Sequence, residues 1–392
     1  MDFLDKKLKQ LQENQGLRRS RPFNANGFEV SESENPEATN RLINFSSNDY
    51  LGLAGDHQLM QDFFAVWKSQ DQSNWMSSSS ARPLTGTSFA HHRLEQTIAN
   101  DYQKEAALLF NSGYHANSGI LPALTDKHDL ILADKLVHAS IIDGLRLGSA
   151  DFKRFAHNDI SHLDKLLQKS RHLYKRVWIV TESLFSMDGD FAKLEAIVDL
   201  KKQYDALIYL DEAHAVGCYG ENGLGLSEQL NVLPEIDILI GVFGKATAGI
   251  GAFAVGNTVL IDSMINFSRS WLFSTALPPM NIAWNDYVWR QLSSFKTQRE
   301  TLKALTTHFR HTLSSMELPV LGESHIVPLL QHGNEQALST AEFLQTKGFL
   351  AMPIRYPTVK KGSERVRFSL TANLPESSID SLIDAIKQSQ SQ

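Results

Sequence analysis

The sequence predicts an α/β protein with a mostly parallel central sheet covered by helices, a smaller C-terminal α+β domain and an N-terminal arm. Two observations lead to this fold class. From about residue 105 onward, short and almost continuous apolar runs alternate with amphipathic helical patterns, which is typical of a parallel sheet buried on both faces. Polar residues also follow several of these runs, and ligands of open α/β sheets bind at the carboxyl ends of strands.

The predicted strands of the central sheet are "AALLF" (106–110), "DLILAD" (129–134), "RVWIVTES" (176–183), "ALIYLDEA" (206–213) and "IDILIGVFG" (236–244). Helical patterns lie between them, at 160–170 and 191–204. Asp134, Glu182, Asp211 and Lys245 stand at or just after strand ends. We therefore expect the functional site at that edge of the sheet.

The pattern changes after about residue 285. A long helix is expected over 280–313, and the later elements are "SHIVPLL", a helix at 335–347, "FLAMPIR", "ERVRFSLTA" and a helix at 377–388. Residues 3–15 read as a charged helix followed by a polar stretch. The predicted division is an arm (1–45), a large domain (46–285) and a small domain (286–392).

Composition restricts the class of protein. The chain has 392 residues, 42% of them apolar, which is enough for a large core. Its net charge of −6 argues against a nucleic-acid or membrane surface. A single cysteine, Cys218, rules out an intrachain disulfide and favours a reducing compartment. The sequence shows no apolar run that could span a bilayer, and its N-terminus is polar, so we predict a soluble cytoplasmic protein. We expect no metal site.

One lysine stands out. Lys245 lies among small and apolar residues in "GVFGKATAGIGAF" (241–253), where an ammonium is poorly solvated. Asp211 lies just past an apolar strand in "YLDEAHAVG" (209–217), and His214 follows three residues later. Pyridoxal phosphate needs a lysine amine for a covalent imine and a carboxylate beside its ring nitrogen. The spacing therefore predicts a pyridoxal phosphate site. Taken singly, these residues would also fit a snorkelling lysine, a helix N-cap and a buried core histidine.

Two other α/β classes are excluded. "DEAH" (211–214) also marks helicases, but the upstream phosphate loop that they need is missing. "GCYGENGLG" (217–225) is rich in glycine, yet it does not have the G-x-G-x-x-G order of dinucleotide-binding proteins.

A phosphate site is expected where "LLFNSGYHANSGI" (108–120) passes from a strand into a helix. Backbone N–H groups near Ser112, Gly113 and Tyr114 would face the phosphate, favoured by the helix dipole. His138, after the next strand, is a candidate to stack on the pyridine ring, although a core or helix-capping histidine fits equally well.

Together these motifs resemble the α-oxoamine synthases, a group of fold-type I pyridoxal phosphate enzymes. The resemblance runs from about Leu17 to the C-terminus. The matching blocks are "NFSSNDYLGL" (44–53), "NSGYHAN" (111–117), "ADKLVHASIIDG" (133–144), "RFAHND" (154–159), "TESLFSMDGD" (181–190), "LDEAHAVGCYGENGLG" (210–225), "FGK" (243–245), "FSTALPP" (273–279) and "PTVKKGSERVRFSLTA" (357–372). Arg355 in "IRYPTV" favours the biotin-pathway subgroup, which condenses L-alanine with a pimeloyl thioester.

The resemblance implies a role for each matching position. Lys245 would bind the cofactor and move the substrate Cα proton, while Asp211 would pair with the ring nitrogen and His138 would stack on the ring. The other implied cofactor contacts are Gly113, Tyr114, Glu182, Ser186 and His214, with Ser274 and Thr275 reaching the phosphate of the neighbouring subunit in a homodimer. The implied substrate contacts are Asn48 and Arg367 for the amino-acid carboxylate and Arg18 and Thr358 on the acyl-donor side. His138 and Arg355 are two further predicted substrate contacts.

One residue and two short segments depart from the group. Val242 stands where a hydroxyl residue usually binds the phosphate, Ser77 to Ser80 replace a glycine-rich segment, and "ATAGIG" (246–251) differs from the usual run after the lysine. Losing one hydroxyl would weaken phosphate binding by about 1–3 kcal/mol unless a neighbour such as Thr247 compensates.

The nearest alternatives are glycine-using siblings, 2-amino-3-oxobutyrate CoA ligase and 5-aminolevulinate synthase. An alternative of another class is a non-catalytic protein with this fold, which Val242 would favour. Whether the acyl carrier is coenzyme A or a carrier protein stays open.

Overall fold

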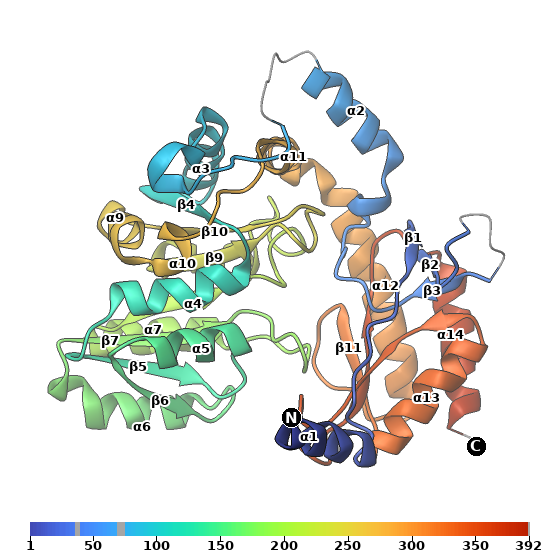
Figure 1. The fold of residues 1–392 in the computed structure, drawn as a ribbon. Coiled ribbons are helices and arrows are strands. Elements are labelled where there is room, and N and C mark those ends of the chain that lie inside the picture. Colours follow the sequence, from blue (N-terminus) through green and yellow to red (C-terminus); the bar gives the residue numbers. More distant parts are fainter. Residues whose placement is uncertain (36–39, 69–74, 391–392) are drawn as a thin grey trace. The chain divides into compact units, whose positions relative to one another are not determined.

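The computed structural model describes residues 1–35, 40–68 and 75–390 (Figure 1). The chain forms two compact units. The small unit comprises Met1–Asp56, Met187–Asp190 and Gln298–Gln392, and the large unit comprises His57–Ser186 and Phe191–Thr297. The domain division predicted at residues 45 and 285 stays a prediction.

A seven-stranded sheet forms the centre of the large unit. Its order is β4 (Ala106–Phe110), β10 (Ala252–Gly256), β9 (Ile238–Val242), β8 (Leu207–Asp211), β7 (Arg176–Glu182), β5 (Asp129–Asp134) and β6 (Asp151–Phe155). β10 runs antiparallel to β4 and β9, and the pairs from β9 to β6 are parallel. The five predicted strands are confirmed, and β6 and β10 were not predicted.

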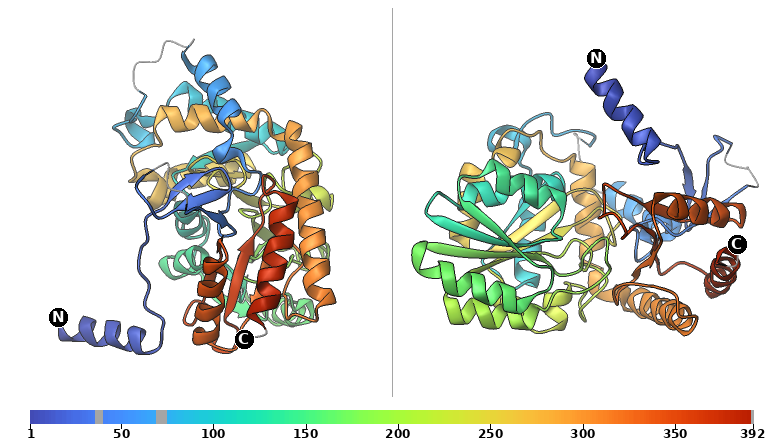
Figure 2. Two further views of the ribbon diagram at one scale, coloured as in Figure 1. Left: turned by 90° about the vertical axis from the view of Figure 1, so that its right-hand side faces the viewer. Right: turned by 90° about the horizontal axis from the view of Figure 1, so that it is seen from below.

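Helices cover both faces of this sheet (Figures 1 and 2). The helices of the large unit are α2 (His57–Lys68), α3 (Phe89–Asp101), α4 (Gly113–Leu124), α5 (Ala139–Leu147), α6 (Ile160–Ser170), α7 (Leu194–Tyr204), α8 (Leu226–Gln229), α9 (Thr258–Phe267), α10 (Arg269–Leu272) and α11 (Pro279–Trp289). α5 lies against α4 at a glycine. A Cβ atom on Gly144 would come within 2.3 Å of the Asn117 carbonyl oxygen, so only glycine permits this approach.

The prediction of one long helix over 280–313 is wrong. The chain forms α11, a 3₁₀ turn at Leu292–Phe295 and then α12 (Lys296–Ser315). Trp289, Leu292 and Phe295 are all buried around this break. Packing of these large side chains therefore overrides a sequence that has no proline or glycine to end the helix.

The small unit contains two short sheets. One has the order β1 (Asn24–Asn26), β2 (Glu29–Ser31), β3 (Leu42–Asn44) and β12 (Phe349–Leu350); the other has the order β11 (Ile326–Leu330), β14 (Arg365–Ser369) and β13 (Met352–Ile354). The helices are α1 (Asp2–Glu13), most of α12, α13 (Asn334–Thr346) and α14 (Glu376–Ser389). The other elements predicted after residue 320 are confirmed to within a few residues, but "FLAMPIR" forms two short strands, β12 and β13, in different sheets. In the described part of the chain, every helix is too short or too polar to cross a membrane.

A buried ion pair supports the start of the large unit. Arg82 Nη2 lies 2.8 Å from Glu95 Oε1, and both side chains are less than a tenth exposed. Glu95 Oε1 also accepts the Leu109 N–H of β4 at 3.0 Å. The Arg82 guanidinium lies 5.4 Å from the centre of the Trp271 ring. Both charges are thus compensated by partners in a place that excludes water.

His91 is buried beside this pair, and we expect it to make stability depend on pH. Burial, followed by the Arg82 charge, lowers its pKa from 6.5 to about 3. Between these values the unfolded chain binds a proton that the folded chain does not, so stability falls as the pH falls. The expected loss is about 1.4 kcal/mol per pH unit, or about 2 kcal/mol from pH 6.5 to 5.

Urea unfolding at several pH values measures this effect. The control is His91→Asn, whose side-chain oxygen can still accept the Ser88 N–H that His91 Nδ1 accepts at 3.2 Å. We expect the free energy of unfolding of this variant to depend less on pH. If it falls equally steeply with pH in both proteins, His91 is not the group responsible.

Candidate active site

A cavity of about 280 Å³ opens in the large unit at the carboxyl ends of its strands. Seven of the predicted cofactor residues line it. They are Gly113, Tyr114, His138, Glu182, Asp211, His214 and Lys245. The remaining lining includes Ser112, Asn117, Ser140, Val242 and Ile250. Residues far apart in the sequence thus meet at the edge that the strand pattern predicted.

The sheet itself sets the spacing of the acidic residues. Glu182 is the last residue of β7 and Asp211 is the last of β8, and the two are paired across these neighbouring strands. β9 ends at Val242, and Lys245 follows in a turn closed by the Ala248 N–H, which donates to the Lys245 carbonyl at 2.9 Å. The parallel register therefore brings two carboxyl groups and one lysine to the same cavity.

Asp211 is held as a hydrogen-bond acceptor. Its Oδ2 accepts from Asn117 Nδ2 at 2.8 Å, and its Oδ1 accepts from the Ala213 N–H at 2.9 Å. Both contacts favour the ionised carboxylate, since a carboxylate only accepts. An ionised Asp211 would hold a proton on a pyridine nitrogen placed beside it.

Burial changes the pKa of two other groups in the cavity, Glu182 and His138. Burial, and then the Asp211 carboxylate, raises the pKa of Glu182 well above its usual value. Burial lowers the pKa of His138, while Asp211 acts against that shift. Glu182 is therefore easier to protonate than an ordinary carboxyl group, and His138 is harder to protonate than an ordinary imidazole, which suits a site for an aromatic ring carrying one positive nitrogen.

The start of α4 provides the opposite end of the cavity. Ser112 is the N-cap, and its side chain accepts the His115 N–H at 3.2 Å. The earlier N–H groups of the helix, at Gly113 and Tyr114, need acceptors from outside the helix, which a phosphate supplies. A Cβ on Gly113 would lie 2.9 Å from Val242 Cγ1, so Val242 packs directly against this glycine. Thr247 is buried, and its hydroxyl donates to the Phe243 carbonyl at 3.0 Å.

The cavity fits pyridoxal phosphate. Besides the lysine, the carboxylate and the helix start, the buried Oε1 atom of Glu182 has no hydrogen-bond partner among the described residues. A buried oxygen without a partner is costly unless a further group occupies the space beside it.

Three predicted cofactor residues lie in the large unit outside this lining: Ser186, Ser274 and Thr275. Thr275 is exposed, and its carbonyl accepts from Asn111 Nδ2 at 2.7 Å. An isolated bridge pairs Thr275 with Ala81. The structure thus places 274–275 near the residue before Ser112 without adding these side chains to the cavity.

Five of the six predicted substrate residues lie in the small unit, and the sixth, His138, lines the cavity of the large unit. Asn48 Oδ1 accepts from the Tyr50 hydroxyl at 3.0 Å, and Arg367 Nη1 donates to Ser369 Oγ at 2.6 Å on β14. Arg18 donates to the Thr358 hydroxyl, and Arg355 donates to the Gln15 carbonyl. The N-terminal segment is therefore tied to the residues around 355–358.

Arg18, Arg355 and Thr358 line a second cavity, of about 700 Å³, within the small unit. Its walls also include the apolar side chains of Leu17, Phe23, Leu338, Met352 and Ile354. Burial, and then the nearby Arg18 charge, lowers the pKa of Arg355. Two guanidinium groups close together beside apolar walls would be stabilised by an anionic group on an aliphatic chain.

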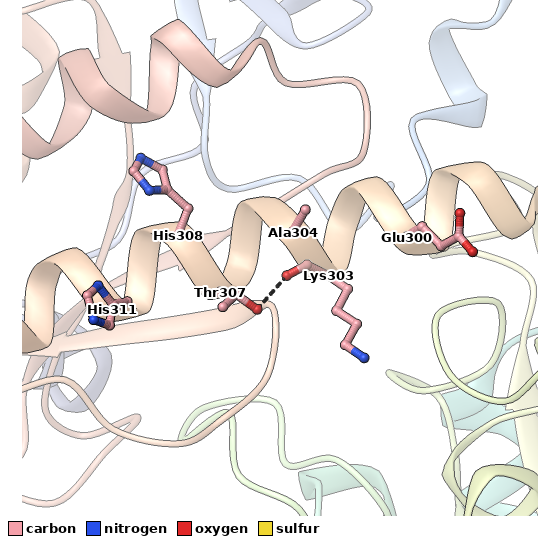
Figure 3. A pocket seen from close by; sticks show the side chains of 6 residues that line it. All are labelled: Glu300, Lys303, Ala304, Thr307, His308 and His311. Atoms are coloured by element: carbon pink, nitrogen blue, oxygen red, sulfur yellow. Dashed lines mark hydrogen bonds between the residues drawn. The ribbon is translucent and has the colours of Figure 1, made fainter.

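A third hollow lies along α12 and has a different character. Figure 3 shows its side chains, which all come from one helix: Glu300, Lys303, Ala304, Thr307, His308 and His311. The Thr307 hydroxyl donates to the Lys303 carbonyl of the same helix at 2.9 Å, and His308 Nε2 lies 2.7 Å from Asp380. One helix face does not provide the convergent polar groups of a binding site.

Three residues behind the cavity, Asn117, Ser140 and Tyr209, were not predicted as site residues from the sequence. Asn117 bonds Asp211, Ser140 bonds His138 Nδ1 at 2.7 Å, and the Tyr209 hydroxyl bonds Asn117 Oδ1 at 2.6 Å. A signal was available, because Asn117 is a polar residue among the apolar residues of "GYHANSGILPAL". Its contact with Ser140, however, depends on how closely α4 approaches α5.

Comparison with known proteins agrees with this geometry. The chain matches the family "Aminotransferase class I and II" over residues 40–386. It is 48% identical over 349 residues to the 8-amino-7-oxononanoate synthase of Haemophilus ducreyi, covering 88% of this chain and 90% of that protein.

Solved structures give the same result. A serine palmitoyltransferase from S. paucimobilis with a bound PLP–myriocin aldimine superposes with a TM-score of 0.89 at 25% identity, covering 100% of this chain and 97% of that one. The 8-amino-7-oxononanoate synthase of Francisella tularensis gives 0.75 at 26% identity, covering 89% and 98%.

These matches bear out the predicted fold and cofactor: the fold is that of fold-type I transferases, and the cofactor is pyridoxal phosphate. The chain therefore belongs to the aminotransferase class I and II family and is a pyridoxal phosphate-dependent enzyme of its α-oxoamine synthase group.

Proposed function

We propose that this enzyme condenses L-alanine with a pimeloyl thioester and releases CO₂ and the free thiol. The product is 8-amino-7-oxononanoate, a biotin precursor. One carbon–carbon bond forms between the alanine Cα and the thioester carbonyl, the carbon–sulfur bond breaks, and the alanine carboxylate leaves as CO₂. The 48% identity to an 8-amino-7-oxononanoate synthase supports this reaction. We propose that the enzyme acts in the cytoplasm.

The cavity around Arg18 and Arg355 carries the choice of acyl donor. Two neighbouring guanidinium groups favour a donor with a distal carboxylate, and the apolar walls favour an aliphatic chain that leads to it. A pimeloyl chain has both features. Thr358, whose hydroxyl accepts from Arg18, would hold that guanidinium in place.

The remaining residues act around the cofactor, which when bound supplies an aldehyde for amines and a ring that withdraws electrons. Lys245 would hold the cofactor and move the proton at the alanine Cα. Asp211 would keep the ring nitrogen protonated, and His138 would cover one face of the ring. We propose Asn48 and Arg367 as ligands of the alanine carboxylate.

We also propose a homodimer with shared active sites. Leu84 and Phe89 are 78% and 85% exposed, and Phe273 is 72% exposed. Phe273 directly precedes the predicted phosphate contacts Ser274 and Thr275, and Leu84 and Phe89 follow Ala81, which forms an isolated bridge with Thr275. A second copy of the chain would cover them. Sedimentation of the purified protein as a monomer would contradict this proposal.

An activity assay tests the reaction. The purified chain with pyridoxal phosphate receives alanine or glycine, and pimeloyl-CoA or pimeloyl carrier protein, while thiol release and product mass are followed. We expect release with alanine and a pimeloyl donor. Thiol release with glycine but not with alanine would assign the enzyme to one of the glycine-using relatives. A protein that stays colourless after the cofactor is added would indicate a non-catalytic relative.

Replacing Arg355 with leucine tests the donor specificity. We expect KM for the pimeloyl donor to rise by about 10- to 100-fold, equivalent to a charge-assisted contact of about 1.5–3 kcal/mol, with little change in kcat. Heptanoyl-CoA is the matched control, because it has the same chain length without the distal carboxylate. If the variant weakens both donors equally, Arg355 does not recognise the carboxylate.

A further inference from the structure

Asn117 is at the centre of a buried hydrogen-bond network behind the cavity. It lies on α4 and is 2% exposed. Its Nδ2 lies 2.8 Å from Asp211 Oδ2 and 3.0 Å from Ser140 Oγ, and its Oδ1 lies 2.6 Å from the Tyr209 hydroxyl. The side-chain amide thus reaches β8 through two residues and α5 through a third.

The close contact of α4 and α5 fixes this geometry. Gly144 lies one turn after Ser140 on α5, and a Cβ there would come within 2.3 Å of the Asn117 carbonyl. Backbone therefore packs on backbone at this point, which places the Ser140 hydroxyl within reach of the Asn117 amide.

The chemistry of the groups gives the network one direction. The Asp211 carboxylate only accepts, so the Asn117 NH₂ group faces it, and the amide oxygen faces Tyr209. The Tyr209 hydroxyl must then donate to that oxygen. Both amide hydrogens are used, one toward Asp211 and the other toward Ser140.

The same reasoning assigns the donor and acceptor roles at His138. Because Ser140 Oγ accepts from Asn117, its own hydrogen is available for His138 Nδ1 at 2.7 Å. The Ser140 backbone N–H also donates to Nδ1, at 3.2 Å. An atom that accepts two hydrogen bonds carries no proton, so the imidazole proton lies on Nε2.

We propose that Asn117 is a positioning residue that orders these hydrogen bonds, holding Asp211 as an ionised acceptor and, through Ser140, His138 as the Nε2–H tautomer. The arrangement is built into the protein before any substrate binds. It concerns the cofactor site and is independent of which acyl donor the enzyme uses. Its failure is therefore distinguishable from failure of the proposed reaction.

The first test measures the tautomer of His138 directly. In full-length protein labelled with ¹⁵N-histidine, NMR distinguishes a protonated from an unprotonated ring nitrogen, and His138→Gln assigns the signals. We expect Nε2–H at neutral pH, with and without pyridoxal phosphate. A proton on Nδ1 in the unchanged protein would overturn the proposal without any variant.

Two variants test the direction of the network. Ser140→Ala removes one of the two donors to His138 Nδ1 and keeps the backbone N–H, so we expect a smaller fraction of the Nε2–H tautomer than in the unchanged protein. Asn117→Asp keeps the size of the side chain but places a second carboxyl group against Asp211, and we expect the Kd for pyridoxal phosphate to rise at least tenfold. A wild-type tautomer in Ser140→Ala, or a wild-type Kd in Asn117→Asp, would contradict the proposal.

Thr125→Val is the matched control. It removes a buried hydroxyl from the end of α4, where Thr125 Oγ1 donates to the Leu121 carbonyl at 2.7 Å. A purely structural role for polar groups on α4 predicts similar losses in this variant. We expect the control to keep both the tautomer and the cofactor affinity, and a control that loses them equally counts against a positioning role for Asn117.

Discussion

Replacing Lys245 with alanine is expected to lower the rate of thiol release by about 10³-fold or more. In the proposed reaction this amine both holds the cofactor and moves the substrate proton, and a positioned acid–base group contributes about 10²- to 10⁴-fold by itself. The side chain lines the cavity beside Asp211 and Glu182. The measurement is the steady-state rate with alanine and pimeloyl-CoA at saturating pyridoxal phosphate.

Two controls separate the loss of an amine from a loss of folding. Lys127→Ala, at an exposed turn of the large unit, is expected to keep the wild-type rate. Added ethylamine should restore part of the activity of Lys245→Ala, because it supplies an amine to the vacated space. A variant that retains more than a tenth of the wild-type rate would remove Lys245 from its proposed role.

Replacing Glu95 with glutamine is expected to destabilise the large unit by about 3–5 kcal/mol, since it leaves the Arg82 charge buried without its counter-charge. Glutamine still provides an oxygen for the Leu109 N–H, which Glu95 Oε1 accepts at 3.0 Å. The variant therefore isolates the charge from the hydrogen bond. Urea unfolding followed by tryptophan fluorescence measures the effect, because Trp271 lies beside Arg82.

The matched control is Glu235→Gln. Glu235 pairs with Lys202 at 2.8 Å, but the two side chains are 35% and 57% exposed. Exposed pairs contribute little to stability, so we expect an unchanged midpoint. Equal shifts in the two variants would show that burial does not set the cost at Glu95.

The strands of the large unit could be predicted because their burial on both faces leaves a continuous apolar run. β5 and β8 show this pattern, since nearly every residue in each is buried. β6 was missed because four of its five residues, Asp151 to Arg154, are exposed at the sheet edge, where charged side chains are tolerated. β10 was missed because "AFAVG" directly follows a glycine-rich turn and was treated as part of the lysine segment.

The sequence pattern predicted only part of the site, because it locates strand ends but not contacts between helices. Residues at strand ends, such as Asp211 and Lys245, could be placed together because parallel strands end at one edge. The partners behind them could not, because Asn117 and Ser140 meet only where two helices touch. The surroundings of Val242 also could not be predicted from the sequence. In the structure its side chain packs against Gly113. The roles of the individual site residues stay predictions.

The contact of α5 with α4 at Gly144 has a consequence for protein engineering. The separation of two side chains that line the cavity, Asn117 and Ser140, is set by a position outside the lining, where one added methyl group would meet backbone. A directed-evolution library confined to the cavity wall would leave that separation unchanged. Libraries intended to broaden the range of amino acids accepted should therefore keep residue 144 fixed while the wall is varied.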